Sequence, residues 1–243
     1  MTVQTTLLVI ADIAGYTRFM KMHFMSLVHA QDIVARLLEA VIDAASSALK
    51  LAKLEGDAAF FYLTLPPGGT FDPELVARQA AAIHRAFHAR AADLRANTLC
   101  PCDGCQQTGD LKIKLVGHIG DVAAQKVKQF TELAGVDVIV VHRMLKNDVP
   151  LPEYLLVTKP VYELLDARLK AAAHAVPLAL EGLGDTDAYY VDLKAWSDCA
   201  PTAPTSLSVP ARLARHLKLT WRSLPYLLGA RKACSQYRNV PLQ

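Results

Sequence analysis

The sequence predicts an α+β fold in which helices cover a mainly antiparallel β-sheet. Residues 7–11 form an apolar run without helical spacing, which is typical of a buried strand. Residues 29–50 carry an apolar stripe at helical spacing, and a Gly-Asp turn at 56–57 separates two further strand-like runs. Helices between strands, followed by a hairpin, favour a sheet covered by helices. Hydrophobic residues make up 52% of the chain and charged residues 20%, as expected for a globular protein.

The elements are expected in the following order. Helices at 16–25 and 29–50 precede a hairpin over about 51–64, and Asp72 or Pro73 opens a helix that ends near Ala96. A polar, cysteine-containing loop spans 97–110, and a strand follows at 111–119 with a pairing segment at 121–129. A helix over 135–145 and strands at 154–158 and 187–193 complete the predicted domain.

An acidic residue stands where the first strand is expected to end. Asp12 follows the apolar run, and Gly15 and Thr17 suit a turn and the start of a helix. Backbone N–H groups at such a turn can meet phosphate oxygens, and the carboxylate can hold a divalent cation. The alternative is that Asp12 merely caps the helix.

A second acidic residue belongs to the predicted hairpin. Asp57 ends the segment Lys53-Leu54-Glu55-Gly56-Asp57. If the hairpin pairs beside the first strand, Asp57 approaches Asp12. Two close carboxylates repel each other unless a cation lies between them. The two aspartates are therefore a candidate metal pair.

The two motifs together resemble the catalytic domain of class III nucleotidyl cyclases. The pattern D-I-x-G-[FY]-T is followed about forty residues later by K-x-x-G-D, and residues 116–122 resemble the family's G-I-H-x-G-x-V strand. The resemblance covers roughly residues 5–195 and implies a ferredoxin-like core. It further implies that Asp12, Asp57 and the backbone of Ile13 hold two Mg²⁺ or Mn²⁺ ions, which bind a triphosphate near Gly15 and activate the ribose 3′-hydroxyl.

The same resemblance assigns the nucleotide-reading positions. Lys53 stands where adenylyl cyclases place a purine-reading lysine, so ATP is the favoured nucleotide. Glu132 takes the position of the second purine contact, and Arg143 that of the arginine that stabilises charge on the reacting phosphate. Family members draw the aspartates from one subunit and the other groups from a second, which implies a homodimer.

The chain departs from the family at two places. Ile139 replaces the asparagine that positions the ribose, and isoleucine offers no hydrogen bond. The late basic residue that clamps the triphosphate is replaced by acidic sequence around 180–184. The resemblance therefore implies either a slow adenylate cyclase that forms cyclic AMP, or a degenerate homologue that acts as a nucleotide- or partner-binding signalling module. A bacterial cyclase-like family of unassigned function shares the pattern D-V-I-x-x-H-R-x-L-K-N at 137–147.

The loop after the third predicted helix contains three closely spaced cysteines. Cys100, Cys102 and Cys105 form C-x-C-x-x-C, whose thiolates can surround one soft cation. We expect a structural Zn²⁺ whose fourth ligand is Cys199, Cys234 or a histidine such as His84 or His88. A redox-sensing group of thiols and an iron–sulfur cluster are the alternatives.

Composition divides the chain into a cyclase-like domain at 1–198 and a basic extension at 199–243. The extension carries seven basic residues and no acidic residue, although the net charge of the whole chain is only +3. Its leucines and Trp221 recur at helical spacing, which predicts an amphipathic basic helix that Pro225 kinks or ends. This helix either lies on an anionic membrane surface, binds a protein partner, or packs on its own domain or a second subunit. Without a signal peptide or a long apolar run, we expect a cytoplasmic protein, peripheral to the membrane at most, with no nucleic-acid partner.

Overall fold

The computed structural model describes residues 3–22, 27–66, 68–100, 103–196 and 203–230. These residues form two compact units. The first unit contains Met1–Ala14, Ala40–Ala86 and Lys112–Ala200, and the second contains Gly15–Glu39, Phe87–Leu111 and Pro201–Gln243. Two helices, α2 (Leu27–Ala45) and α3 (Leu75–Asn97), contribute residues to both.

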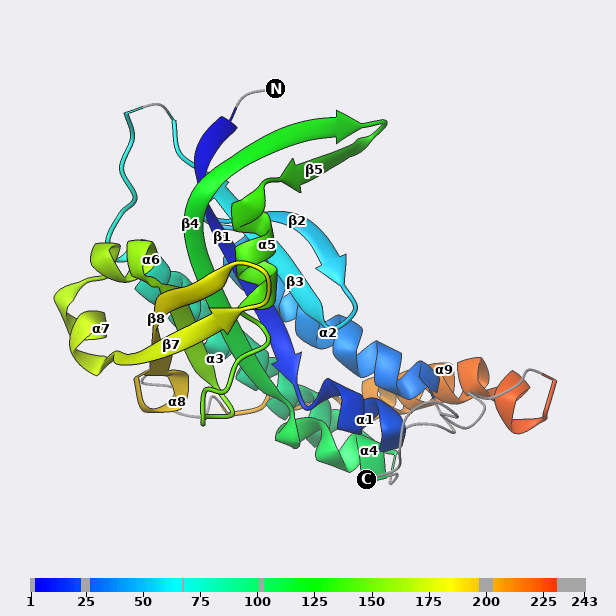
Figure 1. Cartoon of the computed structure of the whole chain (residues 1–243). Coiled ribbons are helices and arrows are strands. Elements are labelled where there is room, and N and C mark those ends of the chain that lie inside the picture. The colour runs from blue at the N-terminus through cyan, green and yellow to red at the C-terminus, as the bar shows by residue number, and fades with distance from the viewer. Residues whose placement is uncertain (1–2, 23–26, 67, 101–102, 197–202, 231–243) are drawn as a thin grey trace. The chain divides into compact units, whose positions relative to one another are not determined.

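The first unit is built on one eight-stranded sheet (Figure 1). Its strands are β1 (Val3–Ala14), β2 (Lys50–Glu55), β3 (Ala58–Thr64), β4 (Lys112–Val127), β5 (Phe130–Ala134), β6 (Tyr154–Thr158), β7 (His174–Leu180) and β8 (Gly184–Asp192). The order across the sheet is β2-β3-β1-β4-β6-β8-β7, and β5 pairs with β4. Only the β4–β6 pairing is parallel among the described strands, so the prediction of a mainly antiparallel sheet is confirmed. The long, curved β4 continues into β5 as a hairpin that leaves the rest of the sheet (Figure 1).

The apolar run in β1 is explained by its central position between β3 and β4. Leu8 and Ile10 are fully buried and belong to a core that includes Val141 and Met144 at helix α5 (Val136–Arg143). Leu7 is also buried and lies on the opposite face of β1. A strand covered on both faces reads as a continuous apolar run rather than an alternating one.

Three short helices lie beside the part of the sheet formed by β6 and β8. They are α6 (Lys159–Leu164), α7 (Ala167–Ala172) and α8 (Leu193–Trp196), and they pack against β6 and β8. Asp166 caps α7, because its carboxylate accepts a hydrogen bond of 2.8 Å from the backbone N–H of Leu169. Helices and sheet together confirm the predicted α+β class.

The second unit is helical. It contains α1 (Tyr16–Met22), α4 (Asp103–Gln106), the 3₁₀ turn η1 (Gln107–Asp110) and α9 (Val209–Leu227), with parts of α2 and α3. Asn97 ties the basic extension to α3, donating to the carbonyl of Thr205 at 2.7 Å and accepting from the N–H of Leu207 at 2.8 Å. Arg215 of α9 forms an ion pair of 3.5 Å with Asp32 of α2. These contacts agree with the alternative in which the extension packs on its own domain.

Several predicted elements are corrected by the structure. Helix α2 ends at Ala45, because β2 already begins at Lys50. Residues 121–127 continue β4 instead of forming a separate pairing strand, and β5 is the partner. The expected cysteine loop contains α4 and η1, and α9 continues past Pro225 to Leu227. Within the described residues, no helix is both long and apolar enough to span a membrane.

Candidate functional site

Asp12 and Asp57 meet at one end of the central strands. Asp12 lies near the end of β1, opposite Ala58 of β3 and Lys114 of β4. Asp57 occupies the tight turn between β2 and β3, which Gly56 permits with a φ of 70°. The backbone N–H of Ile13 donates to the carbonyl of Asp57 at 3.2 Å, which holds this turn against β1. The structure therefore brings together the aspartates that the sequence paired.

The two carboxyl groups lie in an electrostatically unfavourable environment. Burial raises the pKa of Asp57 to about 6, and the negative charge of Asp12 adds to this effect. Burial also raises the pKa of Asp12, although the Lys114 ammonium opposes it. A divalent cation between the carboxylates would remove both penalties. The donor set is thus one that fits Mg²⁺ or Mn²⁺.

Two neighbours of Asp12, Lys114 and Tyr154, were not predicted from the sequence. The ammonium of Lys114 lies 5.7 Å from the ring centroid of Tyr154, whose hydroxyl donates to Asn147 at 3.0 Å. Burial raises the pKa of Tyr154 and the charge of Asp12 raises it further, although the hydrogen bond to Asn147 opposes the shift. Successive residues of a strand point to opposite faces, so Lys114 lies on the same face of β4 as Val116, a residue of the core beneath α5. The alternation of residues 112–116 is the sequence feature that could have predicted the face of Lys114.

The predicted base-reading lysine is held by an acidic neighbour. The ammonium of Lys53 lies 2.8 Å from Glu55, whose carboxylate is also 3.0 Å from Nε2 of His142. The other ring nitrogen of His142 faces the carbonyl of Val138 at 2.7 Å. Burial raises the pKa of Glu55, but the hydrogen bonds and charges of Lys53 and His142 outweigh it, so the pKa lies below its usual value.

The remaining predicted residues lie on or beside α5. Glu132 is exposed on β5, and Arg143 ends α5 with its guanidinium beside Gly182 in the β7–β8 turn. Ile139 is 47% exposed on the same helix. Among the described residues, neither Lys53 nor Arg143 forms an ion pair with either aspartate.

Asp137 at the start of α5 has a structural role. Its carboxylate lies 2.9 Å from Nε2 of His118 and accepts a 2.7 Å hydrogen bond from the backbone N–H of Asp121. Nδ1 of His118 contacts the hydroxyl of Thr158 at 2.8 Å. A Cβ atom at position 120 would overlap the Asp137 carboxyl group, which explains the glycine there. The structure thus agrees with a structural role for His118.

Comparison with known proteins identifies the family. A family model described as "Protein of unknown function (DUF2652)" matches residues 34–154. The Mycobacterium tuberculosis protein described as "Uncharacterized protein Rv2561/Rv2562" is 46% identical over 207 residues, which cover 85% of this chain and 94% of that protein. The chain belongs to the family of Rv2561/Rv2562.

Solved structures show which fold the Rv2561/Rv2562 family has. The adenylyl cyclase CyaB from P. aeruginosa superposes with a TM-score of 0.53 at 15% identity, covering 78% of this chain and 94% of that one. The guanylyl cyclase Cya2 gives 0.56 at 11% identity, covering 78% and 92%. A bacterial light-regulated adenylyl cyclase gives 0.59 at 14% identity, covering 90% of this chain and 58% of that one. The fold is that of class III nucleotidyl cyclase catalytic domains.

Of the other predicted ligands, His84 belongs to the first unit, where its Nε2 lies 3.6 Å from the carboxylate of Glu153, and the rest belong to the second unit or lie outside the described residues. Gly15 has a φ of 87°, and its carbonyl accepts from the N–H of Phe19 at 2.9 Å where α1 begins. Cys100 and Cys105 lie beside His29, a residue that the sequence analysis did not single out. Cys102, Cys199 and Cys234 lie outside the described residues.

Proposed function

We propose that this protein binds ATP together with Mg²⁺ or Mn²⁺ and converts it slowly to cyclic AMP. The observation that carries the proposal is the convergence of Asp12 and Asp57, fixed by the 3.2 Å hydrogen bond from Ile13 to the carbonyl of Asp57. Perturbed pKa values such as that of Asp57, which burial and the charge of Asp12 raise, cluster at functional sites. The class III cyclase fold supports the same assignment.

The metal ions would be held by the carboxylates of Asp12 and Asp57 and by the backbone of Ile13. Bound there, divalent cations supply charge neutralisation for the triphosphate and for the attacking and leaving oxygens. In the reaction, the ribose 3′-oxygen bonds to the α-phosphorus while the bond to pyrophosphate breaks. Turn residues between β2 and β3 and the end of β1 orient the two carboxylates for this step.

Recognition of the base falls to Lys53 and Glu132, and Arg143 would stabilise charge on the reacting phosphate. Lys53 already carries a hydrogen-bonded partner, Glu55, which would steady the ammonium against an acceptor on the purine. Because Ile139 offers no hydrogen bond to the ribose, we expect a slow reaction. Loss of one such group commonly costs about 10²–10³ in rate.

We further propose a homodimer with composite sites. Within one chain, the described residues show no interaction between Arg143 or Lys53 and the aspartates. A second copy that contributes Lys53, Glu132 and Arg143 to the aspartates of the first would complete the site. This arrangement gives two equivalent sites per dimer.

A second candidate function is favoured by the residue at position 139. Ile139 is 47% exposed on α5, so an apolar side chain faces solvent where a ribose contact is needed. A degenerate cyclase homologue would bind nucleotide at the aspartates and signal by conformation, without turnover. Binding without product distinguishes this function from the first.

Calorimetry of Mn²⁺–ATP binding to the full chain tests the proposal. We expect Asp12→Asn and Asp57→Asn each to weaken binding at least tenfold, because each removes an anionic metal ligand. Asp185→Asn, at an exposed position on β8, is the matched control and should bind normally. Unchanged affinity in both site variants would overturn the assignment, and a cyclic AMP assay on the same samples separates the two functions.

A further inference from the structure

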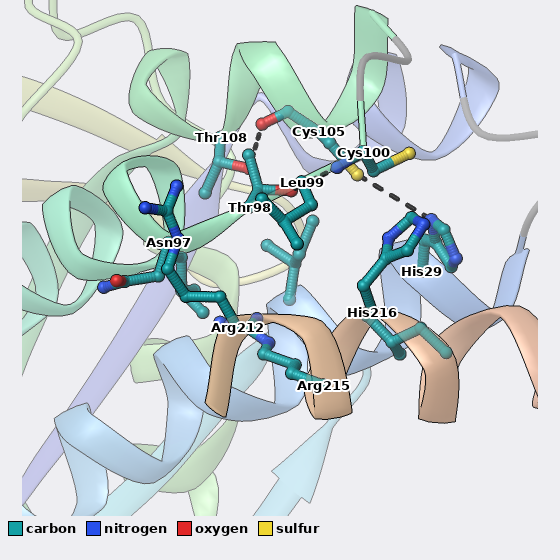
Figure 2. Close-up of a pocket in the computed structure, with 13 residues that line it drawn as sticks. His29, Asn97, Thr98, Leu99, Cys100, Cys105, Thr108, Arg212, Arg215 and His216 are labelled. Carbon is teal, nitrogen blue, oxygen red and sulfur yellow. Dashed lines mark hydrogen bonds between the residues drawn. The ribbon is translucent and has the colours of Figure 1, made fainter. Parts of the chain in front are cut away.

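The second unit contains a pocket rich in metal-ligating side chains (Figure 2). Its walls come from the start of α2, the end of α3 with residues 98–100 that follow it, the α4–η1 segment and α9. His29, Cys100 and Cys105 line it together with Arg215 and His216. None of these residues belongs to the proposed nucleotide site.

Three of these side chains are arranged as a ligand set. The candidate ligand atoms of His29, Cys100 and Cys105 all lie within 4.8 Å of one another. The sulfur of Cys105 is 3.8 Å from Nδ1 of His29, and both residues are buried, with exposures of 5% and 8%. Small side-chain rotations would bring all three atoms to the 2.0–2.3 Å (approximate) bond lengths of a zinc site.

We propose that this pocket is a structural zinc site in which His29, Cys100, Cys105 and His216 are the four ligands. His216 of α9 lines the same pocket as the three-residue ligand set, and Figure 2 shows its side chain extending from α9 into the pocket on the side of His29. Two thiolates and two imidazoles are a common ligand set for tetrahedral Zn²⁺. The two thiolate charges also neutralise the cation, so burial of the complex is not opposed by net charge.

Hydrogen bonds hold the backbone groups of Cys100 and Cys105. The hydroxyl of Thr108 donates to the carbonyl of Cys105 at 2.9 Å, and the N–H of Cys100 donates to the hydroxyl of Thr98 at 3.3 Å. Gln106 donates to the carbonyl of Cys100 at 3.4 Å. The backbone is therefore organised around the pocket, as in preorganised metal sites.

The positive charge of α9 beside the pocket is partly compensated. Arg215 lies in an ion pair of 3.5 Å with Asp32, which also accepts from Arg36 at 2.8 Å. The guanidinium of Arg215 also interacts electrostatically with Cys105. A cation can therefore enter despite the basic helix.

The ligand set differs from the one that the cysteine spacing implied. His29 and His216 flank the cysteines from α2 and α9, which lie far from them in the sequence. A metal bound here would join three chain segments and anchor the C-terminal helix within the second unit. This role is independent of the proposed cyclase function.

Elemental analysis of the full chain, purified without chelator, tests the site first. We expect about one zinc per chain, and a Co²⁺-substituted protein should show the thiolate-to-metal absorption of a tetrahedral site. Zinc well below one equivalent, together with no Co²⁺ spectrum after reconstitution, would overturn the proposal. This measurement does not depend on whether any variant folds.

Substitutions then test the ligands. We expect His29→Ala and Cys105→Ser to abolish the stoichiometric zinc, and His216→Ala to weaken Co²⁺ affinity about 10–100-fold, on the scale of disturbed metal sites. His174→Ala, at an exposed histidine on β7, is the matched control and should keep the metal. Full zinc content in the His29→Ala variant would place the site elsewhere and overturn the assignment. Trypsin should release α9 faster from the chelated wild-type chain than from the zinc-loaded one, and equal rates would exclude the anchoring role.

Discussion

At the scale of single residues, the carboxyl group of Asp57 is a proposed metal ligand that destabilises the metal-free fold at neutral pH. Its folded-state pKa is about 6, raised from 3.8 by burial and by Asp12. The folded chain therefore binds this proton more tightly than the unfolded chain does. The resulting stability is fully present below about pH 4 and is lost as the pH rises through about 6. At neutral pH the metal-free site is thus a source of instability.

Replacing this carboxylate should consequently stabilise the metal-free protein. We expect Asp57→Asn to raise the Tm at pH 7.5, and the gain should vanish at pH 4.5, where the wild-type group is protonated. Because the group is only half-buried, solvent screening limits the gain to on the order of 1 kcal/mol, or roughly 2–4 °C for a chain of this size. Differential scanning calorimetry measures both values.

The matched control and the metal complete this test. Asp185→Asn, at an exposed position on β8, should leave the Tm unchanged at both pH values. Mn²⁺–ATP should raise the Tm of the wild type but not that of Asp57→Asn, because ligand binding to the folded state is lost. A lower Tm for Asp57→Asn at pH 7.5 would contradict the unfavourable environment assigned to this carboxyl.

At the scale of elements, the C-terminal helix α9 is the segment whose role the sequence left open. Its start is anchored by Asp93 and Asn97, since the N–H of Thr205 donates to Asp93 at 2.6 Å and that of Leu207 to Asn97 at 2.8 Å. Yet apolar side chains on α9 stay exposed, among them Leu217 at 58% and Trp221 at 76%. One face of α9 packs on the rest of its unit. Binding of a membrane or a protein partner by the other face stays a prediction.

Deletion of residues 206–243 tests whether the second unit depends on the tail. We expect the truncated chain to have a lower Tm or to become insoluble, because it loses the Asn97–Leu207 bond and the Arg215–Asp32 ion pair. Trp221→Ala, which changes the exposed face alone, is the control and should melt like the wild type. A truncated chain that is soluble and equally stable would instead identify the tail as an arm for an external partner.

Sequence patterns anticipated the elements that are long or carry a turn signal. The β1 run, the hairpin around Gly56 and strand β6 follow from apolar runs and a glycine turn, which are local properties. Helices α4 and α6 to α8 were missed, because each has at most six residues and so shows little periodicity.

The sequence predicts the site residues that belong to a contiguous motif. It does not predict contacts that depend on strand register or helix packing. Asp12 and Asp57 each stand at a recognisable strand end. Lys114 faces Asp12 only through the β1–β4 register, and His29 reaches the cysteines only through helix packing. The alternation of residues 112–116 gives the face of β4 on which Lys114 lies but not its partner across the sheet, and no local pattern marks the placement of His29.

At the scale of the whole molecule, this chain combines the class III cyclase fold with an incomplete set of catalytic groups. Metal-holding carboxylates are retained at the end of β1, whereas Ile139 and the acidic sequence near Glu181 replace groups that act on the nucleotide. A homodimer would add Lys53, Glu132 and Arg143 of the second copy to each pair of aspartates, but an identical copy cannot supply the group that Ile139 replaces. The central claim is that Asp12 and Asp57 form a metal site for nucleotide.

A crystal structure of the full chain with a non-cyclisable ATP analogue and Mn²⁺ tests this claim most directly. We expect an anomalous manganese signal between the carboxylates of Asp12 and Asp57, with the triphosphate bound to the manganese ion. We also expect the adenine beside Lys53 and Glu132 of a second copy. Nucleotide bound without metal at these carboxylates, or manganese and nucleotide together at another place on the chain, would contradict this claim.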